Sequence, residues 1–319
     1  MIPLLEIDDL HIGYPTDHGT VELVRGLSFA MEAGDAVRLV GESGSGKSQT
    51  ALAILRLLRP PVRILKGSIR FDGQDLARAD ERAMRHLRGS VISMVFQDAL
   101  SGLNPAFTVG TQLMDVITAH RRVGRAEART IAFEALGMVG IREPEQRLRQ
   151  YPHQFSGGMR QRVLIAMAIA CRPRLLIADE PTTALDVTVQ AQIVALLKEL
   201  RERLGLALLF ITHNLDLMSQ VCDRAIVLYG GMLMEEAPVA ALFDSPRQPY
   251  TRALLACVPR LSDPPGQVTS IDGSPPVAGR LGPGCPFVPR CSLRIEQCDA
   301  RPPERANVSR RVACWRAEV

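Results

Sequence analysis

The stretch GESGSGKS, residues 41–48, decides the fold of this chain, because it matches the pattern G-x-x-x-x-G-K-[ST] at every fixed position. The apolar residues 36–40 precede it and have the composition of a buried strand. Residues 48–58 follow with apolar side chains at helical spacing, and Pro60 and Pro61 end that pattern. Strand, glycine loop and helix are the context in which this motif binds phosphate, so a glycine-rich turn that matched by chance is the weaker alternative.

The glycines of this loop let the backbone turn tightly and direct several N–H groups into a concave anion site. The helix that follows adds the positive end of its dipole. Lys47 is then able to reach the β- and γ-phosphates of a nucleotide, and Ser48 is able to ligate Mg²⁺. The nucleotide contacts predicted from the loop are Gly41, Glu42, Ser43, Gly44, Ser45, Gly46, Lys47 and Ser48.

Length and composition narrow the class of protein. The chain has 319 residues, enough for one large or two modest domains, and 46% of them are hydrophobic, which supports a real core. Its net charge of +4 is too weak to indicate nucleic-acid binding. No apolar run approaches the roughly 18 residues needed to span a bilayer, and the N-terminus lacks the pattern of a signal peptide. We therefore expect a cytoplasmic protein, unless something holds it at a membrane.

The order of elements predicts an α/β fold with a P-loop NTPase core. Strands alternate with helices, which favours a mainly parallel sheet covered on both faces. Residues 4–12 alternate apolar and polar side chains, and residues 21–24 and 27–32 have the pattern of two further short strands, so we predict an N-terminal antiparallel β subdomain. Beyond residue 244 prolines accumulate and regular patterns nearly stop. We predict a first domain at 1–244, with a helical insert at about 98–155, and a loop-rich extension at 245–319.

Two adjacent carboxylates, Asp179 and Glu180, follow the apolar strand predicted at 175–178. Asp179 at a strand end is suited to hold Mg²⁺ through its water shell, and Glu180 is suited to polarise an attacking water as a general base. The alternative is a pair of acids that only begins a helix before Pro181, since Asp and Glu favour helix N-termini.

A second anion site is predicted at Ser156, Gly157 and Gly158, which precede a strongly apolar helix. Small residues with free N–H groups at a helix N-terminus bind phosphate. Two phosphate-binding elements separated by a helical insert are unusual for a simple kinase.

On these motifs, residues 4–244 resemble the ATP-binding subunit of an ABC transporter. In that family two subunits sandwich two ATPs, and the serine-glycine signature contacts the γ-phosphate of ATP held by the partner's phosphate loop. The usual signature is Leu-Ser-Gly-Gly-Gln. This chain has Phe155 and Met159 at the outer positions, and Met cannot supply the glutamine amide.

The resemblance implies roles for four further residues. Tyr14 would stack on adenine, although a tyrosine that only ends a strand is the alternative. Gln97 would sense Mg²⁺ and the attacking water and link to the membrane subunits. Asp186 would lie in the loop that crosses the dimer interface, and His213 would contact the γ-phosphate. The implied catalytic set is Glu180, His213 and Gln97, and the implied Mg²⁺ set is Ser48, Gln97 and Asp179.

The extension resembles the C-terminal region of oligopeptide and dipeptide importer ATPases, through residues 245–255, 284–287 and 290–291. The resemblance implies ATP hydrolysis that energises peptide uptake at the cytoplasmic face of the inner membrane. It also implies a second ATPase subunit, two membrane permeases and an extracytoplasmic binding protein. Related importers carry nickel, glutathione or sugars, so the solute stays open.

Two other classes of function compete with this interpretation. A soluble ABC ATPase of translation carries two ATPase units per chain, and one of DNA repair carries a long coiled coil; neither feature occurs in this sequence. A nucleotide-binding scaffold without turnover would not need Lys47, Asp179, Glu180 and His213 together.

Four cysteines of the extension are spaced C-x5-C-x6-C-x15-C. A reducing cytoplasm disfavours disulfides, and a stretch with few large apolar residues would gain a crosslink from a bound metal centre. Structural zinc usually uses tighter pairs, and the spacing also differs from common ferredoxin patterns. We favour a [4Fe–4S] cluster over zinc, with free thiols as the third alternative. The predicted ligands are Cys285, Cys291, Cys298 and Cys314.

Overall fold

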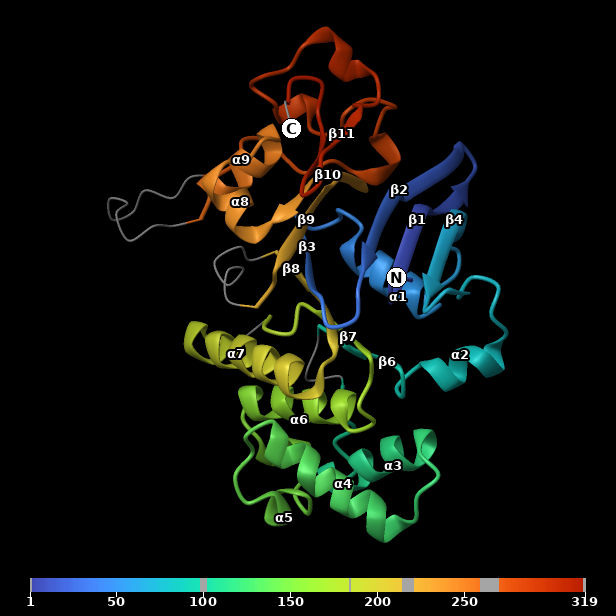
Figure 1. Ribbon diagram of the computed structural model, residues 1–319, viewed down its shortest axis with the longest axis vertical. Coiled ribbons are helices and arrows are strands. Elements are labelled where there is room, and N and C mark those ends of the chain that lie inside the picture. The colour runs from blue at the N-terminus through green and yellow to red at the C-terminus, as the bar shows by residue number, and fades with distance from the viewer. Residues whose placement is uncertain (1, 98–101, 184, 214–220, 259–269, 318–319) are drawn as a thin grey trace. The chain divides into compact units, whose positions relative to one another are not determined.

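A computed structural model describes residues 2–97, 102–183, 185–213, 221–258 and 270–317 (Figure 1). The chain divides into two compact units. The first unit holds residues 1–31, 37–77 and 211–319, and the second holds residues 32–36 and 78–210. The extension belongs to the same compact unit as the phosphate loop, and the predicted domains at 1–244 and 245–319 stay a prediction.

The first unit contains the predicted antiparallel sheet. Its strands are β1 (Leu5–Thr16), β2 (Gly19–Met31), β4 (Arg63–Phe71) and β5 (Gln74–Asp75), in the order β2-β1-β4-β5. Alternation of apolar and polar residues puts Leu5 and Ile7 in the core. An irregularity between Ile7 and Leu10, where Asp9 has a φ of +43°, shifts the alternation, so that Ile12 is buried as well. Two short strands expected at 21–24 and 27–32 are one strand, since Gly26 takes a φ of +76° and bends β2 without ending it.

The nucleotide-binding part of this unit starts at β3 (Ala36–Val40), whose five residues are all buried. β3 is parallel to β9 (Arg224–Tyr229), and β9 pairs antiparallel with β10 (Met232–Pro238). Helix α1 (Lys47–Ile54) follows the phosphate loop. It ends four residues before the predicted end, because Arg56 takes a left-handed conformation with a φ of +50°.

The extension is more ordered than the sequence suggests. Helix α8 (Val239–Asp244) directly precedes it. The extension itself contains α9 (Pro249–Ala256) and the hairpin of β11 (Glu304–Ala306) and β12 (Arg311–Ala313). β12 pairs antiparallel with β10, so the extension adds strands to the edge of the nucleotide-binding sheet. The cysteines are therefore not the only feature that organises the extension. Three short 3₁₀ helices complete it, at Ala278–Arg280, Val288–Arg290 and Glu296–Asp299.

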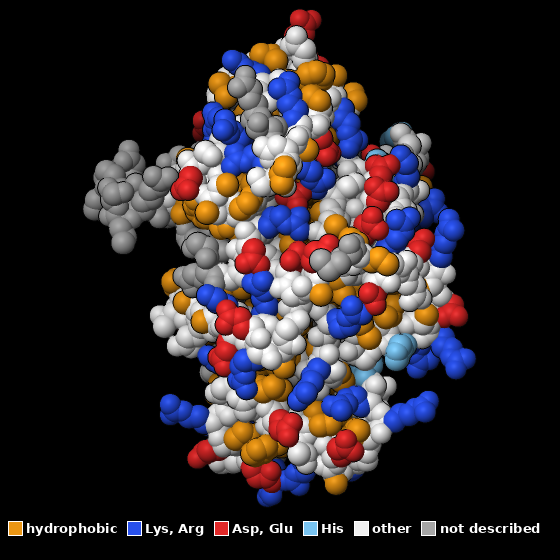
Figure 2. Space-filling view, viewed as in Figure 1, with side chains coloured by type: hydrophobic (Ala, Val, Ile, Leu, Met, Phe, Trp, Pro, Cys, Tyr) orange, Lys and Arg blue, Asp and Glu red, His pale blue; other side chains and the backbone are white. Residues whose placement is uncertain are grey.

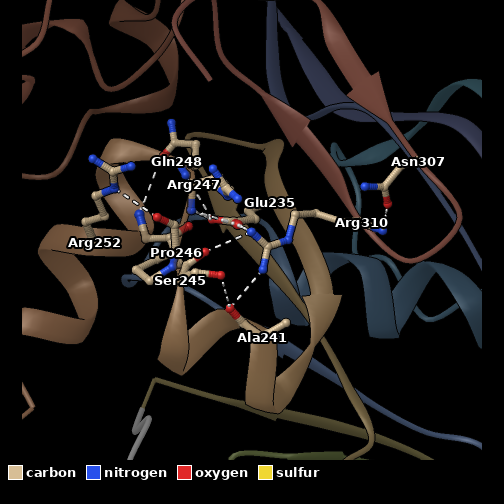
Figure 3. A network of polar contacts seen from close by, with 10 residues as sticks. Glu235, Ala241, Ser245, Pro246, Arg247, Gln248, Arg252, Asn307 and Arg310 are labelled. Carbon is tan, nitrogen blue, oxygen red and sulfur yellow. Dashed lines mark hydrogen bonds and ion pairs between the residues drawn. The ribbon is translucent and has the colours of Figure 1, made fainter. Parts of the chain in front are cut away.

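A buried carboxylate on β10 ties the start and the end of the extension together (Figure 3). Glu235 is fully buried and accepts hydrogen bonds from the backbone N–H groups of Arg247 and Gln248, both at 3.0 Å. Arg310, which precedes β12, lies 3.7 Å from the same carboxylate and donates to the carbonyl of Ser245 at 2.8 Å. A buried charge is tolerable only with such partners, so this network fixes where α9 begins.

The second unit holds β6 (Ile92–Val95), β7 (Leu175–Asp179) and most of β8 (Ala207–Thr212), with β7 between the other two. β6 and β7 are parallel, as predicted. Among the described residues of both units, no helix is long and apolar enough to cross a membrane. Its helices are α2 (Glu81–Leu87), α3 (Val109–His120), α4 (Arg125–Met138), α5 (Pro144–Arg147), the 3₁₀ helix Pro152–Gln154, α6 (Gly157–Ile169) and α7 (Val187–Leu204).

Within the helical insert, α3 and α4 are separate helices. Arg121 is extended and ends α3, and Gly124 caps the start of α4. α4 packs against both α3 and α6, which buries one face of each helix (Figure 1). Residues 98–101, where the insert was predicted to begin, lie outside the described part of the chain.

Candidate functional site

The phosphate loop takes a shape that requires its glycines. Gly41 has a φ of +154°, and a Cβ there would lie 2.1 Å from the carbonyl oxygen of Leu228. Gly46 caps α1 with a φ of +96°, and a Cβ there would lie 2.8 Å from Cγ2 of Val24. Any larger residue would therefore displace the backbone at both ends of the loop.

Lys47 lies inside this loop and is only 5% exposed. Its ammonium Nζ donates to the carbonyl oxygens of Gly41 at 2.7 Å and Glu42 at 2.9 Å, and to Oγ of Ser45 at 3.3 Å. The cation is thus held within the curve of the loop, beside the start of α1. Ser48 is half-buried in the first turn of α1, and its hydroxyl is the type of hard oxygen that Mg²⁺ prefers.

Two residues of the extension contact Glu42 of the phosphate loop, which the sequence did not predict. The backbone N–H of Glu42 donates to the hydroxyl of Tyr250 at 3.0 Å. Nη1 of Arg290 donates to Oε2 of Glu42 at 2.7 Å and to the hydroxyl of Tyr229 at 2.9 Å. The sequence pattern had singled out Tyr250 and Arg290 only as marks of resemblance, because contacts across more than 200 residues leave no local signal.

Tyr14 and His213 belong to the same unit as the loop. Tyr14 is half-buried on β1 opposite Val21 of β2. His213 is exposed directly after β8, and the residues 214–220 that follow it lie outside the described part. Their predicted contacts to adenine and to the γ-phosphate stay predictions.

The carboxylates lie in the second unit, where the structure joins Glu180 to Gln97. Asp179 is the last residue of β7 and is 6% exposed. Oε2 of Glu180 accepts hydrogen bonds from Nε2 of Gln97 at 2.9 Å and from Oγ1 of Thr183 at 3.0 Å. Glu180 also has a φ of +47°, which costs a non-glycine residue about 1 kcal/mol or more. Asp179 is a buried carboxylate at the end of a strand, and carboxylate oxygens are ligands that Mg²⁺ prefers.

The serine-glycine signature forms the start of α6. Ser156 caps the helix, since its Oγ accepts from the N–H of Met159 at 3.3 Å. A Cβ on Gly158 would lie 2.7 Å from Cγ1 of Val189, so this glycine allows α6 to approach α7. Ser156 and Gly157 are exposed. Their surface position agrees with the predicted role of an anion site for a partner.

The unusual outer residues of the signature have different surroundings. Phe155 is 3% exposed, and the guanidinium carbon of Arg147 lies 6.0 Å from the centre of its ring. Phe155 is therefore a buried apolar side chain at the position where the usual signature has leucine. Met159 is half-buried. Nearby, Asp186 caps α7 by accepting from the N–H of Val189 at 2.9 Å, while Ala184 of the same loop lies outside the described residues.

The four cysteines of the extension line one cavity of about 20 Å³. None of them forms a disulfide. The pKa of the Cys285 thiol is raised to about 11, chiefly by burial and further by the three other cysteines. A cavity of this volume holds about one water-sized group, so a four-iron cluster does not fit with the side chains as they lie. Across the described residues, no three Cys, His, Asp or Glu side chains are arranged to ligate one metal ion.

Two family models match the chain. The model described as "ABC transporter" matches residues 24–183, and the model described as "Oligopeptide/dipeptide transporter, C-terminal region" matches residues 234–298. The first match contains the phosphate loop, the signature and the carboxylates, and the second covers α8, α9 and much of the extension.

Curated relatives match the chain over nearly its full length. The dipeptide transport ATP-binding protein DppD of Bacillus subtilis is 45% identical over 318 residues, which cover 99% of this chain and 95% of the relative. The oligopeptide transport ATP-binding protein OppD of Salmonella typhimurium is 46% identical over 314 residues, which cover 98% of this chain and 93% of the relative.

Solved structures also match. The ATP-binding cassette MJ0796, a dimer in a post-hydrolysis state with ADP and Pi, has a TM-score of 0.66 at 27% identity and covers 74% of this chain and 98% of its own. The protein cbiO1 of Clostridium perfringens, part of the ABC transporter complex cbiONQ, has a TM-score of 0.67 at 26% identity. The match covers 77% of this chain and 92% of cbiO1.

Proposed function

This chain belongs to the ABC transporter family, among the ATP-binding proteins of the oligopeptide and dipeptide type, and from this we propose that it hydrolyses ATP to energise the uptake of di- or oligopeptides. The observation that carries the proposal is the combination of a complete ATPase motif set with a C-terminal region of the peptide-transporter type. A soluble ATPase of translation or DNA repair would not need that region. Nickel, glutathione and sugars remain alternative solutes.

Under this proposal, each residue of the motif set has its own role in ATP binding or hydrolysis. The loop at 41–48 binds the phosphates through backbone N–H groups, and Lys47 offsets their charge. Ser48, Asp179 and Gln97 are assigned to Mg²⁺, which when bound offsets charge on the β- and γ-phosphates. Glu180 is the base that polarises the attacking water, with its carboxylate oriented by Gln97 and Thr183. His213 and Tyr14 are assigned to the γ-phosphate and adenine.

Two ATPase subunits are needed for turnover under this proposal. The signature residues Ser156, Gly157 and Gly158 would contact ATP held by the phosphate loop of a second, similar subunit, with Asp186 at that interface. This arrangement is supported by the exposed position of Ser156 and Gly157 at the start of α6. Two permeases and an extracytoplasmic binding protein complete the proposed importer, which would hold this chain at the cytoplasmic face of the inner membrane.

The helical insert is the proposed docking site for a permease. A hollow of about 640 Å³ lies along α3 and α4 and is lined by Met114, Arg125 and Leu148 among others. Phe107 and Phe133 of the same region are 51% and 44% exposed. Figure 2 shows hydrophobic side chains interrupting the charged surface of these helices at the lower end of the view. A crosslinking map that placed the permease contacts elsewhere would contradict the assignment.

The function is tested by reconstituting the chain, its second ATPase and the two permeases in lipid vesicles. We expect ATP-dependent uptake of labelled di- and oligopeptides, and ATP hydrolysis that rises when peptide-loaded binding protein is added. Uptake of nickel, glutathione or a sugar in place of peptides would identify another solute. Full ATPase activity of the chain alone, without any membrane partner, would contradict the transport proposal.

For the four cysteines we propose a metal centre, supported by their position around one cavity. Their side chains would have to move apart before a cluster could bind, because the cavity of about 20 Å³ is too small for one. Anaerobically purified protein with a cluster should be brown, absorb near ~400 nm and contain iron and acid-labile sulfide. One zinc per colourless chain would identify zinc instead. In both cases Cys291→Ser should reduce the metal content. If protein purified without air contained no metal and four titratable thiols, the proposal of a metal centre would be contradicted.

A further inference from the structure

We propose that Arg290 and Tyr250 of the C-terminal extension are positioning residues for ATP binding: they hold Glu42 and so keep the phosphate loop ready for the nucleotide. The inference rests on the proposed ATPase function and deepens it. Neither residue is assigned to touch ATP. Both act through Glu42, which is the second residue of the loop at 41–48.

The extension engages both the backbone and the side chain of Glu42. The Tyr250 hydroxyl accepts the Glu42 backbone N–H at 3.0 Å, and Arg290 binds the Glu42 carboxylate at 2.7 Å. The Arg290 side chain is 6% exposed and that of Glu42 19%, so this ion pair is largely shielded from water. Shielding strengthens a charge-assisted hydrogen bond and makes the loss of one partner costly.

Besides Glu42, three further hydrogen-bond partners hold the guanidinium of Arg290 in place. Nη1 also donates to the Tyr229 hydroxyl at 2.9 Å, Nε donates to the carbonyl of Asp272 at 2.8 Å, and Nη2 donates to that of Ile271 at 3.0 Å. A planar guanidinium is required for these directions, and a lysine ammonium could satisfy only some of them. The side chain is thus fixed before any nucleotide binds.

Tyr250 is equally fixed. It is fully buried, and its ring lies 4.4 Å from that of Tyr229 and 5.3 Å from that of Phe287, between ring centres. Gln248 caps α9 by accepting from the N–H of Tyr250, and Gln248 is itself anchored on Glu235 (Figure 3). A chain of contacts therefore runs from the β10 carboxylate through α9 to the loop.

The charge of Glu42 gives Arg290 a purpose beyond packing. A carboxylate in a loop that binds a polyanion repels the ligand unless a cation compensates for it. Arg290 supplies that cation from the extension, through its contact with the Glu42 carboxylate. Removing Arg290 should therefore weaken ATP binding by an electrostatic route, and removing the Glu42 charge as well should restore it. An arginine that only anchored the extension would not show this rescue.

The test is the Kd for ATP of the purified full-length chain, measured by calorimetry. Arg290→Ala should raise the Kd roughly tenfold, which corresponds to the loss of one charge-assisted contact. The double variant Glu42→Gln, Arg290→Ala should return to within about threefold of wild type. The deficit of Arg290→Ala should also shrink at higher salt, because ions screen the repulsion. In the reconstituted importer, KM for ATP should rise while kcat changes less than about twofold.

Matched variants separate positioning from stability. Tyr250→Phe keeps the ring packing and removes only the acceptor for the Glu42 N–H, so we expect a rise in Kd of about threefold. Arg290→Lys should lie between wild type and Arg290→Ala. Arg294→Ala is the control, because Arg294 is 54% exposed in the same extension and pairs only with Asp299 in the described contacts. Its Kd should not change.

The outcomes are distinct. A folded Arg290→Ala protein with the wild-type Kd, or one that Glu42→Gln does not rescue, would overturn the inference. If Arg290→Ala fails to fold, a wild-type Kd in Tyr250→Phe would overturn it instead. A wild-type chain that binds no ATP would refute the proposed function itself, which is a different result.

Discussion

Gln97 and Glu180 are joined by a hydrogen bond of 2.9 Å, in which the amide Nε2 of Gln97 donates to Oε2 of the glutamate. The two residues are 83 positions apart. They meet because β6 and β7 are parallel neighbours, so the residues that follow both strands lie at the same sheet edge. Thr183 donates to the same oxygen at 3.0 Å, so two donors orient the Glu180 carboxylate.

Glu180→Gln should retain ATP binding and lose most turnover. The amide keeps the size of the side chain but cannot accept a proton, and the loss of a general base costs about 10²–10⁴-fold. ATPase rates of the assembled transporter and ATP binding by the chain measure the two effects. Glu199→Gln on the exposed face of α7 is the control and should turn over normally. Near-normal hydrolysis in Glu180→Gln would exclude Glu180 as the base.

Gln97→Ala should slow hydrolysis by roughly 10-fold to 150-fold, because a hydrogen bond to a charged group contributes about 1.5–3 kcal/mol to orienting the base. Binding of ATP in the absence of Mg²⁺ should be unchanged. Thr183→Val removes the other donor to Glu180 and should give a comparable loss. If Gln97→Ala hydrolyses ATP normally but uncouples it from uptake, its role lies with the membrane subunits and not with Glu180.

Gly158→Ala should destabilise the second unit, whereas Gly157→Ala should be nearly neutral. A Cβ on Gly158 would lie 2.7 Å from Cγ1 of Val189, but one on Gly157 would lie 3.4 Å from Leu185. We expect a loss of about 1–3 kcal/mol for the first, as for other overpacked sites. Chemical denaturation of both variants provides the measurement. Val189→Ala should recover much of the loss in Gly158→Ala, and a failure to do so would place the strain elsewhere.

Sequence patterns predicted the local structure around the proposed site. The phosphate loop was predictable because β3 and α1 carry their own periodicity, and Glu180 because it follows an apolar strand, whereas the role of Gln97 came only from the family resemblance. Strands β11 and β12 were missed since they have three residues each, too few for alternation to show. The contact of Glu42 with Arg290 spans 248 positions and depends on the folded extension, so no local pattern encodes it.

Glu235→Gln should loosen the extension and, through it, the phosphate loop. The carboxylate is fully buried, pairs with Arg310 and accepts from the N–H groups of Arg247 and Gln248 (Figure 3). Glutamine keeps one acceptor oxygen but leaves the buried arginine without a counter-charge, which should cost about 3–5 kcal/mol of unfolding free energy.

Because Gln248 and Tyr250 depend on this anchor, the Kd for ATP should rise together with the loss of stability in Glu235→Gln. Glu304→Gln provides the control, since Glu304 is 41% exposed on β11 and lies 3.9 Å from Arg311. That variant should unfold and bind ATP like wild type, because exposed ion pairs contribute only about 0–1 kcal/mol. A Glu235→Gln protein that is destabilised but binds ATP with the wild-type Kd would show that the anchor stabilises the extension without reaching the loop.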